Sequence, residues 1–187
     1  MDSEQQVKKV IAFVRANTSI EIEVSDREIK GVWGGCEIIE GNVLVSSKTL
    51  PHPGSLLHEI GHVATTPKPL RRFMSYDLQG FGNKCIKYQE KKEITECFLS
   101  YSDDSAATFW GFCVSNAIGL DSSLIFREGY EDSKVQWNPE HRGFALHRTC
   151  LASDRSAIGT TFSCSAFYLG LTNSKGTITI DKWELDV

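Results

Sequence analysis

The N-terminal part of the chain has the hydrophobic spacing of an amphipathic helix followed by a strand. Between residues 4 and 16, apolar side chains recur every three or four positions, at Val7, Val10, Ile11 and Val14. This spacing places them on one face of a helix that packs on a core. From Ile20 the period changes to two, because apolar residues alternate with Glu21 and Glu23. The alternation predicts a strand.

Two further segments continue the strand pattern. Cys36–Glu40 and Asn42–Ser46 are rich in apolar residues and flank a Gly41-Asn42 turn signal. Together with the alternating segment they predict a small, largely antiparallel sheet.

Later helices are marked by the residues that end them. A helix at 54–65 is bracketed by prolines, which a helix interior does not tolerate: Pro51, Pro53, Pro67 and Pro69. A second helical pattern runs from residue 103 to 118 and ends at Gly119. The remaining pattern predicts a loop-rich stretch at 68–100, with a helix starting near Lys91. It also predicts helices at 122–127 and 140–152 and a strand near the C-terminus.

This order of elements predicts an α+β fold in one domain, 1–187, because no linker or composition shift divides the 187 residues. We expect a core at 1–130 and a C-terminal extension at 131–187 packed on it. A net charge of −4 without a Lys/Arg-rich stripe argues against a nucleic-acid partner. The polar start of the chain and its short apolar runs argue against export and against a membrane. Six cysteines without a Cys-x-x-Cys motif then favour reduced thiols in the cytoplasm.

The most informative motif is His58-Glu59-Ile60-Gly61-His62, in the helix bracketed by prolines. Histidines four residues apart lie on one helix face and can bind one zinc ion. Glu59 is rotated from them by about 100°, where it can act as a general base rather than as a ligand. The motif therefore predicts a zinc-dependent hydrolase. Gly61 has two explanations: a close approach by another backbone or by the metal site, or a glycine without a special role.

A catalytic zinc ion usually has three protein ligands and an open position for water. Asp103 and Asp104 stand at the head of the later helix and are the candidates for the third ligand. Acidic residues are also common at helix N-termini because they offset the macrodipole. Position in the sequence alone does not decide between a zinc ligand and a residue that stabilises the helix N-terminus. The small residues Ala106 and Ala107 would let this helix lie close to another one.

These motifs together resemble the ImmA/IrrE-type minigluzincins, a family of small zincin-like metallopeptidases. The resemblance covers about residues 1–130 and rests on a strand at Asn42–Ser46, the His58–His62 motif, and an acidic residue followed by Ala and Phe109-Trp110. A group of uncharacterised bacterial proteins with an acidic pair and a later Gly-Tyr is closer still, and the chain has Gly129-Tyr130. The resemblance implies an N-terminal helix, a small sheet, an active-site helix and a second ligand-bearing helix.

The resemblance also implies a mechanism. One Zn²⁺ would be held by His58, His62 and Asp104, with Asp103 as the alternative third ligand, and Glu59 would deprotonate the attacking water. The substrate would be a peptide or protein. His147, His141 and Tyr130 are candidates for stabilising the oxyanion. The chain departs from the family in having Asp where the family has Glu, and the shorter side chain requires the two helices to lie closer together.

Three alternatives stay open from the sequence. Cys36 could supply a zinc-binding thiolate, as in peptide deformylases, although the glycine and glutamine motifs of that family are absent. The domain could bind zinc as a regulatory or interaction module without turnover. Finally, the two histidines could occur together by chance and bind no metal.

Overall fold

The computed structural model describes residues 1–30, 34–66, 68–75, 104–125 and 183–184. In chain order, its elements are α1 (Ser3–Asn17), β1 (Ile22–Ser25), β2 (Cys36–Ile39), β3 (Asn42–Ser46), α2 (Pro53–Ala64), α3 (Lys68–Arg71), α5 (Asp104–Ala117) and the 3₁₀ helix η2 (Ser122–Ile125). This mixture of helices and a small sheet confirms the predicted α+β class.

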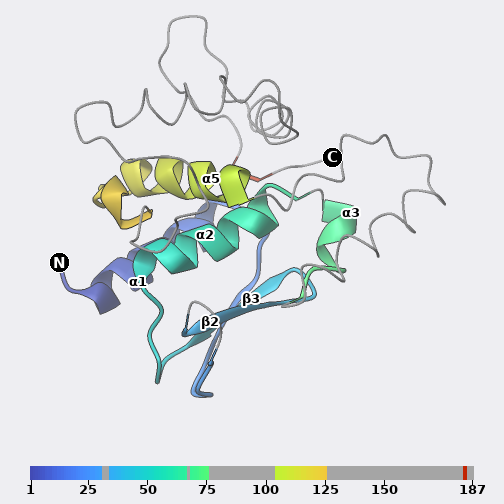
Figure 1. Ribbon diagram of the computed structural model, residues 1–187, viewed down its shortest axis with the longest axis horizontal. Coiled ribbons are helices and arrows are strands. Elements are labelled where there is room, and N and C mark those ends of the chain that lie inside the picture. The colour runs from blue at the N-terminus through green and yellow to red at the C-terminus, as the bar shows by residue number, and fades with distance from the viewer. Residues whose placement is uncertain (31–33, 67, 76–103, 126–182, 185–187) are drawn as a thin grey trace, which may run out of the picture.

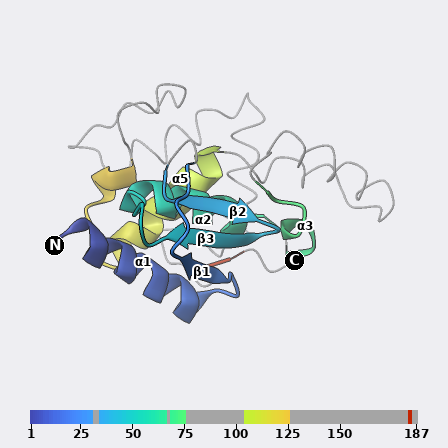
Figure 2. The same ribbon diagram turned by 90° about the horizontal axis from the view of Figure 1, so that it is seen from below.

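The described elements form layers with α2 in the middle. Figure 1 shows α2 between the sheet on one side and α5 on the other. In the view of Figure 2, α1 runs along the side of the sheet where β1 lies. Apolar residues from α1, the sheet, α2, α5 and η2 share one hydrophobic core, which also takes in Leu70 and Met74. The expected boundary near residue 130 lies outside the described residues.

Helix α1 forms as its hydrophobic spacing predicts. Its four stripe residues are all buried: Val7, Val10, Ile11 and Val14. Asp2 caps the N-terminus, because its side chain accepts a hydrogen bond from the backbone N–H of Gln5. At the other end the backbone turns extended at Thr18 and leads into β1.

The sheet has three described strands in the order β1-β3-β2, and its directions correct the sequence prediction. β2 pairs with β3 antiparallel, as expected of a hairpin, but β1 pairs with β3 in parallel. The sheet is therefore mixed rather than largely antiparallel. Alternating hydrophobicity predicts a strand but carries no information about which neighbour it joins or in which direction.

The β2–β3 hairpin turn lies one residue earlier than the predicted Gly41-Asn42. Glu40 and Gly41 form the loop with positive φ angles of 50° and 80°, and Asn42 already belongs to β3. This conformation suits a two-residue hairpin. Gly41 is also required sterically, since a Cβ there would lie 2.6 Å from the carbonyl oxygen of Arg71.

Helix α2 begins one residue before its predicted start. Pro53 occupies the first turn, where proline is tolerated because that N–H has no partner within the helix. The His52 side chain caps the helix by accepting a hydrogen bond from Gly54 N at 3.2 Å. After α2, the residues predicted as a loop include the short helix α3, with Pro69 in its first turn.

Helices α2 and α5 run antiparallel and in close contact. A Cβ on Gly61 would lie 2.4 Å from the carbonyl oxygen of Ala107 and 2.8 Å from its Cα. One turn away, a Cβ on Gly111 would lie 3.2 Å from the Cβ of Leu57. Gly61 is therefore the point of close backbone approach, which settles its two explanations in favour of packing. The Ala107 side of α5 faces α2, as the small residues predict.

Trp183 and Glu184 tie the last described part of the chain to three other elements. Trp183 packs edge-on against Phe13 of α1, and its carbonyl accepts a hydrogen bond from Trp110 Nε1 at 2.8 Å. Glu184 accepts hydrogen bonds from Ser19 and Arg71. Other predicted features of 126–182, including the helix at 140–152, lie outside the described residues.

Replacing Gly61 by alanine tests the helix contact. Alanine gains about 1 kcal/mol in helix propensity, but its methyl group meets backbone atoms of α5, which move only if the whole helix shifts. We expect Gly61→Ala to lower the free energy of unfolding by about 1–3 kcal/mol in urea titrations. Gly111→Ala is the matched control and should cost less, because its shortest contact, 2.7 Å, is to the flexible end of Ile125. A stabilised Gly61→Ala variant would contradict this packing.

The carboxylate of Glu184 gives a second prediction. Burial alone would raise its pKa, but hydrogen bonds from Arg71 and from Ser19 outweigh burial and lower the pKa below its usual range. Glu184 therefore stabilises the folded state above the pKa of the unfolded chain, and this contribution is lost as the pH falls through the lowered folded-state pKa. Unfolding measured from pH 7 to pH 3 should show a steeper loss of stability for the parent than for Glu184→Gln. The exposed Glu40→Gln variant should follow the parent.

Candidate metal centre

His58 and His62 lie side by side within α2 and are almost fully buried, with 2% and 1% of their surfaces exposed. Their rings meet edge to face with centroids 4.5 Å apart. The two Nε2 atoms are 3.0 Å apart, so both nitrogens approach the same point. The i, i+4 spacing read from the sequence thus brings the two rings together.

This geometry is close to that of a metal-binding pair. Two nitrogens at about 2.0–2.1 Å from one tetrahedral zinc ion lie about 3.3 Å apart. The observed separation of 3.0 Å needs only a small opening of the two rings to reach that value. Burial favours such a site, because surrounding side chains hold the rings in place. The two histidines therefore fit as two of the three expected zinc ligands.

Helix geometry places the two histidines on the part of the α2 surface between the side that faces α5 and the side that faces the sheet. Leu57 and Gly61 define the side of α2 that faces α5, and the histidines lie about 100° around the helix from it. Glu59 lies about another 100° further, and its charge acts on Cys36 at the start of β2. Glu59 is only partly buried, unlike the residues on either side of it. The carboxylate therefore borders the histidine pair on the side of the sheet.

Cys36 is a buried thiol beside this carboxylate. Burial, and to a smaller extent the charge of Glu59, raises the pKa of the Cys36 thiol to about 12. Cys36 and Cys113 are both free and buried, as expected for the two cysteines in the described ranges, and burial raises the pKa of Cys113 as well.

No third ligand is seen among the described side chains. Within the described ranges, no group of three His, Cys, Asp or Glu residues could hold a metal ion together. Cys36 therefore does not complete the pair there. Asp104 is the first residue of α5, three positions before Ala107, and the structure describes its backbone only. Asp103, Tyr130, His141 and His147 lie outside the described residues.

The C-terminal end of α2 is held by contacts that the sequence analysis did not identify. The hydroxyls of Thr65 and Thr66 donate to the carbonyl oxygens of Gly61 and His62, at 2.8 and 2.7 Å. Arg71 Nε donates to the carbonyl oxygen of Thr66 at 2.8 Å. Arg71 and Lys68 also form ion pairs with Glu184, at 2.7 and 3.3 Å.

One signal could have revealed part of this arrangement. Threonines at the end of a helix commonly donate a hydrogen bond to the carbonyl four residues earlier, and the Thr65-Thr66 pair stands at that place. Nothing in the sequence pairs Arg71 with Glu184, since their contact depends on the tertiary fold. The network fixes the last turn of α2, which carries His62.

None of the described helices is long and apolar enough to cross a membrane. No family model matches the chain. Searches of curated proteins and of solved structures also give no match.

Proposed function

We propose that the protein is a zinc-dependent hydrolase, most specifically a metallopeptidase, with its centre on α2. The observation that carries the proposal is the convergence of the His58 and His62 Nε2 atoms at 3.0 Å inside the core, next to the partly buried Glu59. Two imidazoles and an adjacent carboxylate on one helix supply two of the three zinc ligands and the base that this chemistry requires.

Each residue has a distinct task in this proposal. His58 and His62 hold the metal, and their burial restricts ring motion. A zinc ion bound there would supply Lewis acidity toward a peptide carbonyl. Glu59 accepts the proton of the attacking water and later passes it to the leaving amine. Its partial exposure fits a group that must reach both substrate and solvent.

The helix contact supports Asp104 as the third ligand over Asp103. The resemblance places the ligand three residues before an alanine, so Ala106 selects Asp103 and Ala107 selects Asp104. Ala107 is the alanine whose backbone lies against Gly61, next in sequence to His62. The close approach of α5 also suits an aspartate, whose side chain is shorter than that of glutamate.

The role of Glu59 can be tested by mutation. Zinc content is measured by elemental analysis of untagged protein, and turnover by mass spectrometry of a diverse peptide mixture. Glu59→Gln should keep stoichiometric zinc and lose about 10²- to 10⁴-fold in kcat, because the proton acceptor is removed. Glu40→Gln makes the same change of charge at the exposed hairpin turn and should retain full turnover.

The outcomes of this experiment separate the hypotheses. A chelator should abolish turnover, and added zinc should restore it. Full activity in zinc-loaded Glu59→Gln would disprove the assigned base. Stoichiometric zinc without turnover in the parent would instead support a zinc-binding regulatory domain. Zinc below stoichiometry that is unchanged by His58→Ala would mean that no metal site exists.

A second prediction concerns the third ligand. Loss of a residue that merely supports a ligand typically weakens metal binding by about 10–100-fold, and loss of a ligand costs at least as much. We expect Asp104→Asn to weaken zinc binding by about 100-fold or more in competition with a chromophoric chelator. Asp103→Asn should have a smaller effect, and the control Cys36→Ser should have none. A larger loss of zinc affinity in Asp103→Asn than in Asp104→Asn would make Asp103 the third ligand.

A further inference from the structure

We propose that the outer edge of β1 is a docking site for an extended basic segment of another protein, which adds to the sheet as a further strand. The proposal goes beyond the hydrolase and needs neither the histidines nor a metal. It rests on the backbone of β1, on the grooves along it, and on the side chains of its two faces.

The first argument is the direction of the β1 backbone groups. β1 lies at one edge of the described sheet, whose strand order is β1-β3-β2. The carbonyl oxygens of Glu21 and Ser25 accept hydrogen bonds from Val43 N and Ser47 N, at 2.9 and 2.8 Å, and so face β3. Backbone groups alternate along a strand, so those of Ile22 and Val24 face away from the sheet.

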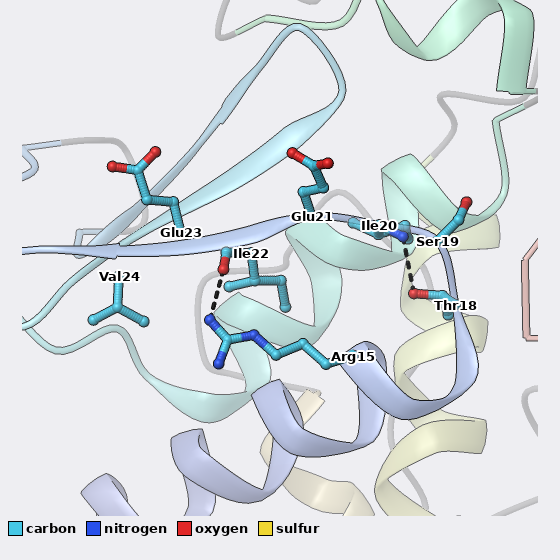
Figure 3. A pocket seen from close by; sticks show the side chains of 8 residues that line it. All are labelled: Arg15, Thr18, Ser19, Ile20, Glu21, Ile22, Glu23 and Val24. Carbon is cyan, nitrogen blue, oxygen red and sulfur yellow. Dashed lines mark hydrogen bonds between the residues drawn. The ribbon is translucent and has the colours of Figure 1, made fainter.

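This outer edge is only partly protected. Arg15 of α1 donates to the carbonyl oxygen of Ile22 at 2.7 Å and so covers one acceptor (Figure 3). In the described part of the chain, no strand pairs with Ile22 N–H or with the backbone groups of Val24. Proteins usually protect such edges with proline, lysine or a bulge, and β1 has neither proline nor lysine.

A groove follows this edge along seven consecutive residues. It is lined by Arg15 and by the chain from Thr18 to Val24, and its volume is about 610 Å³. An extended segment rises about 3.3 Å per residue, so the groove offers a matching length of backbone to another extended chain. Peptide recognition by strand addition uses such a site, with backbone hydrogen bonds for affinity and side chains for specificity.

The two faces of β1 define the side chains that the partner needs. Glu21 and Glu23 extend to one side of the strand in Figure 3, and both are exposed. Ile22 and Val24 extend to the other side. Opposite charges stabilise neighbouring strands when they lie on the same face. The partner should therefore carry lysine or arginine at alternate positions.

An apolar groove on the other face of β1 specifies the remaining positions of the partner segment. It lies between α1 and the sheet, has a volume of about 380 Å³, and shares Arg15 and Val24 with the edge groove. Its apolar lining includes Val7, Ile11, Val45 and Leu50. Among the described residues, Val24 and Leu50 are two of the few large apolar side chains that are exposed, at 50% and 40%. Apolar side chains that alternate with the basic ones would enter this groove.

The same charges disfavour a second copy of the chain as the partner. Pairing two β1 edges would place Glu21 and Glu23 of one copy beside those of the other. Like charges on neighbouring strands are destabilising. A basic segment removes this repulsion and keeps the backbone pairing.

The test uses the full chain and a fluorescein-labelled ten-residue peptide of alternating lysine and valine, with binding followed by fluorescence anisotropy. The parent should bind this peptide, and a peptide with glutamate in place of lysine should not bind. Glu21→Gln/Glu23→Gln should weaken binding by about three- to tenfold through two cross-strand charge pairs. The matched control Glu28→Gln/Glu40→Gln loses the same net charge elsewhere and should stay within twofold of the parent.

A backbone variant separates strand addition from simple charge attraction. Val24→Pro removes an N–H that faces away from β3, so circular dichroism should show an intact fold while binding falls by at least about tenfold. Leu50→Asn tests the apolar groove without any change of backbone or charge and should also weaken binding.

Several results would overturn the proposal. They are the absence of binding by the folded parent, an equal loss in the two double-glutamine variants, and full binding by both folded Val24→Pro and Leu50→Asn. Sedimentation that shows a dimer dissociated by Val24→Pro would identify a second copy as the occupant and overturn it as well.

Discussion

The contact between Gly61 and the backbone of Ala107 is the constraint on which the candidate site depends. α2 carries both histidines, and its position is fixed on opposite sides by α5 and by the sheet. Since the Gly61 contact joins two backbones, α5 cannot be displaced by a side-chain rearrangement alone. The same contact sets the distance between His62 and the start of α5, where the proposed third ligand lies. Packing and the proposed metal centre therefore share one requirement at residue 61, the absence of a side chain.

Much of the fold follows from local pattern. The stripe of α1, the proline-bracketed helix α2 and the glycine-terminated α5 were all predicted to within two residues, because hydrophobic period and helix ends are properties of neighbouring residues. The convergence of His58 and His62 was equally predictable, since one helical turn fixes it. The role of Gly61 in packing was one of two explanations, and only the position of α5 decides between them.

What could not be predicted depends on residues far apart in sequence. The parallel pairing of β1 with β3 requires knowledge of the connection between them, and alternation of side chains does not supply it. The hairpin turn was displaced by one residue because Glu40, an uncommon residue at positive φ, takes a turn position. The ion pairs of Glu184 with Arg71 and Lys68 join segments more than a hundred residues apart. Of the candidate site, the third ligand stays a prediction.

The attachment of Glu184 to Ser19 and Arg71 has a consequence for folding during synthesis. Translation proceeds at about 5–20 residues per second, so α2 leaves the ribosome several seconds before the residues that anchor its C-terminal turn. In the first part of that interval, before α5 has been synthesised, the apolar surface of α2 lacks the helix that covers it, and Trp183 follows only at the end. Contacts between such distant segments also slow folding, because the chain between them must be ordered first. The nascent chain therefore exposes its histidine helix for a time in which chaperones can bind it.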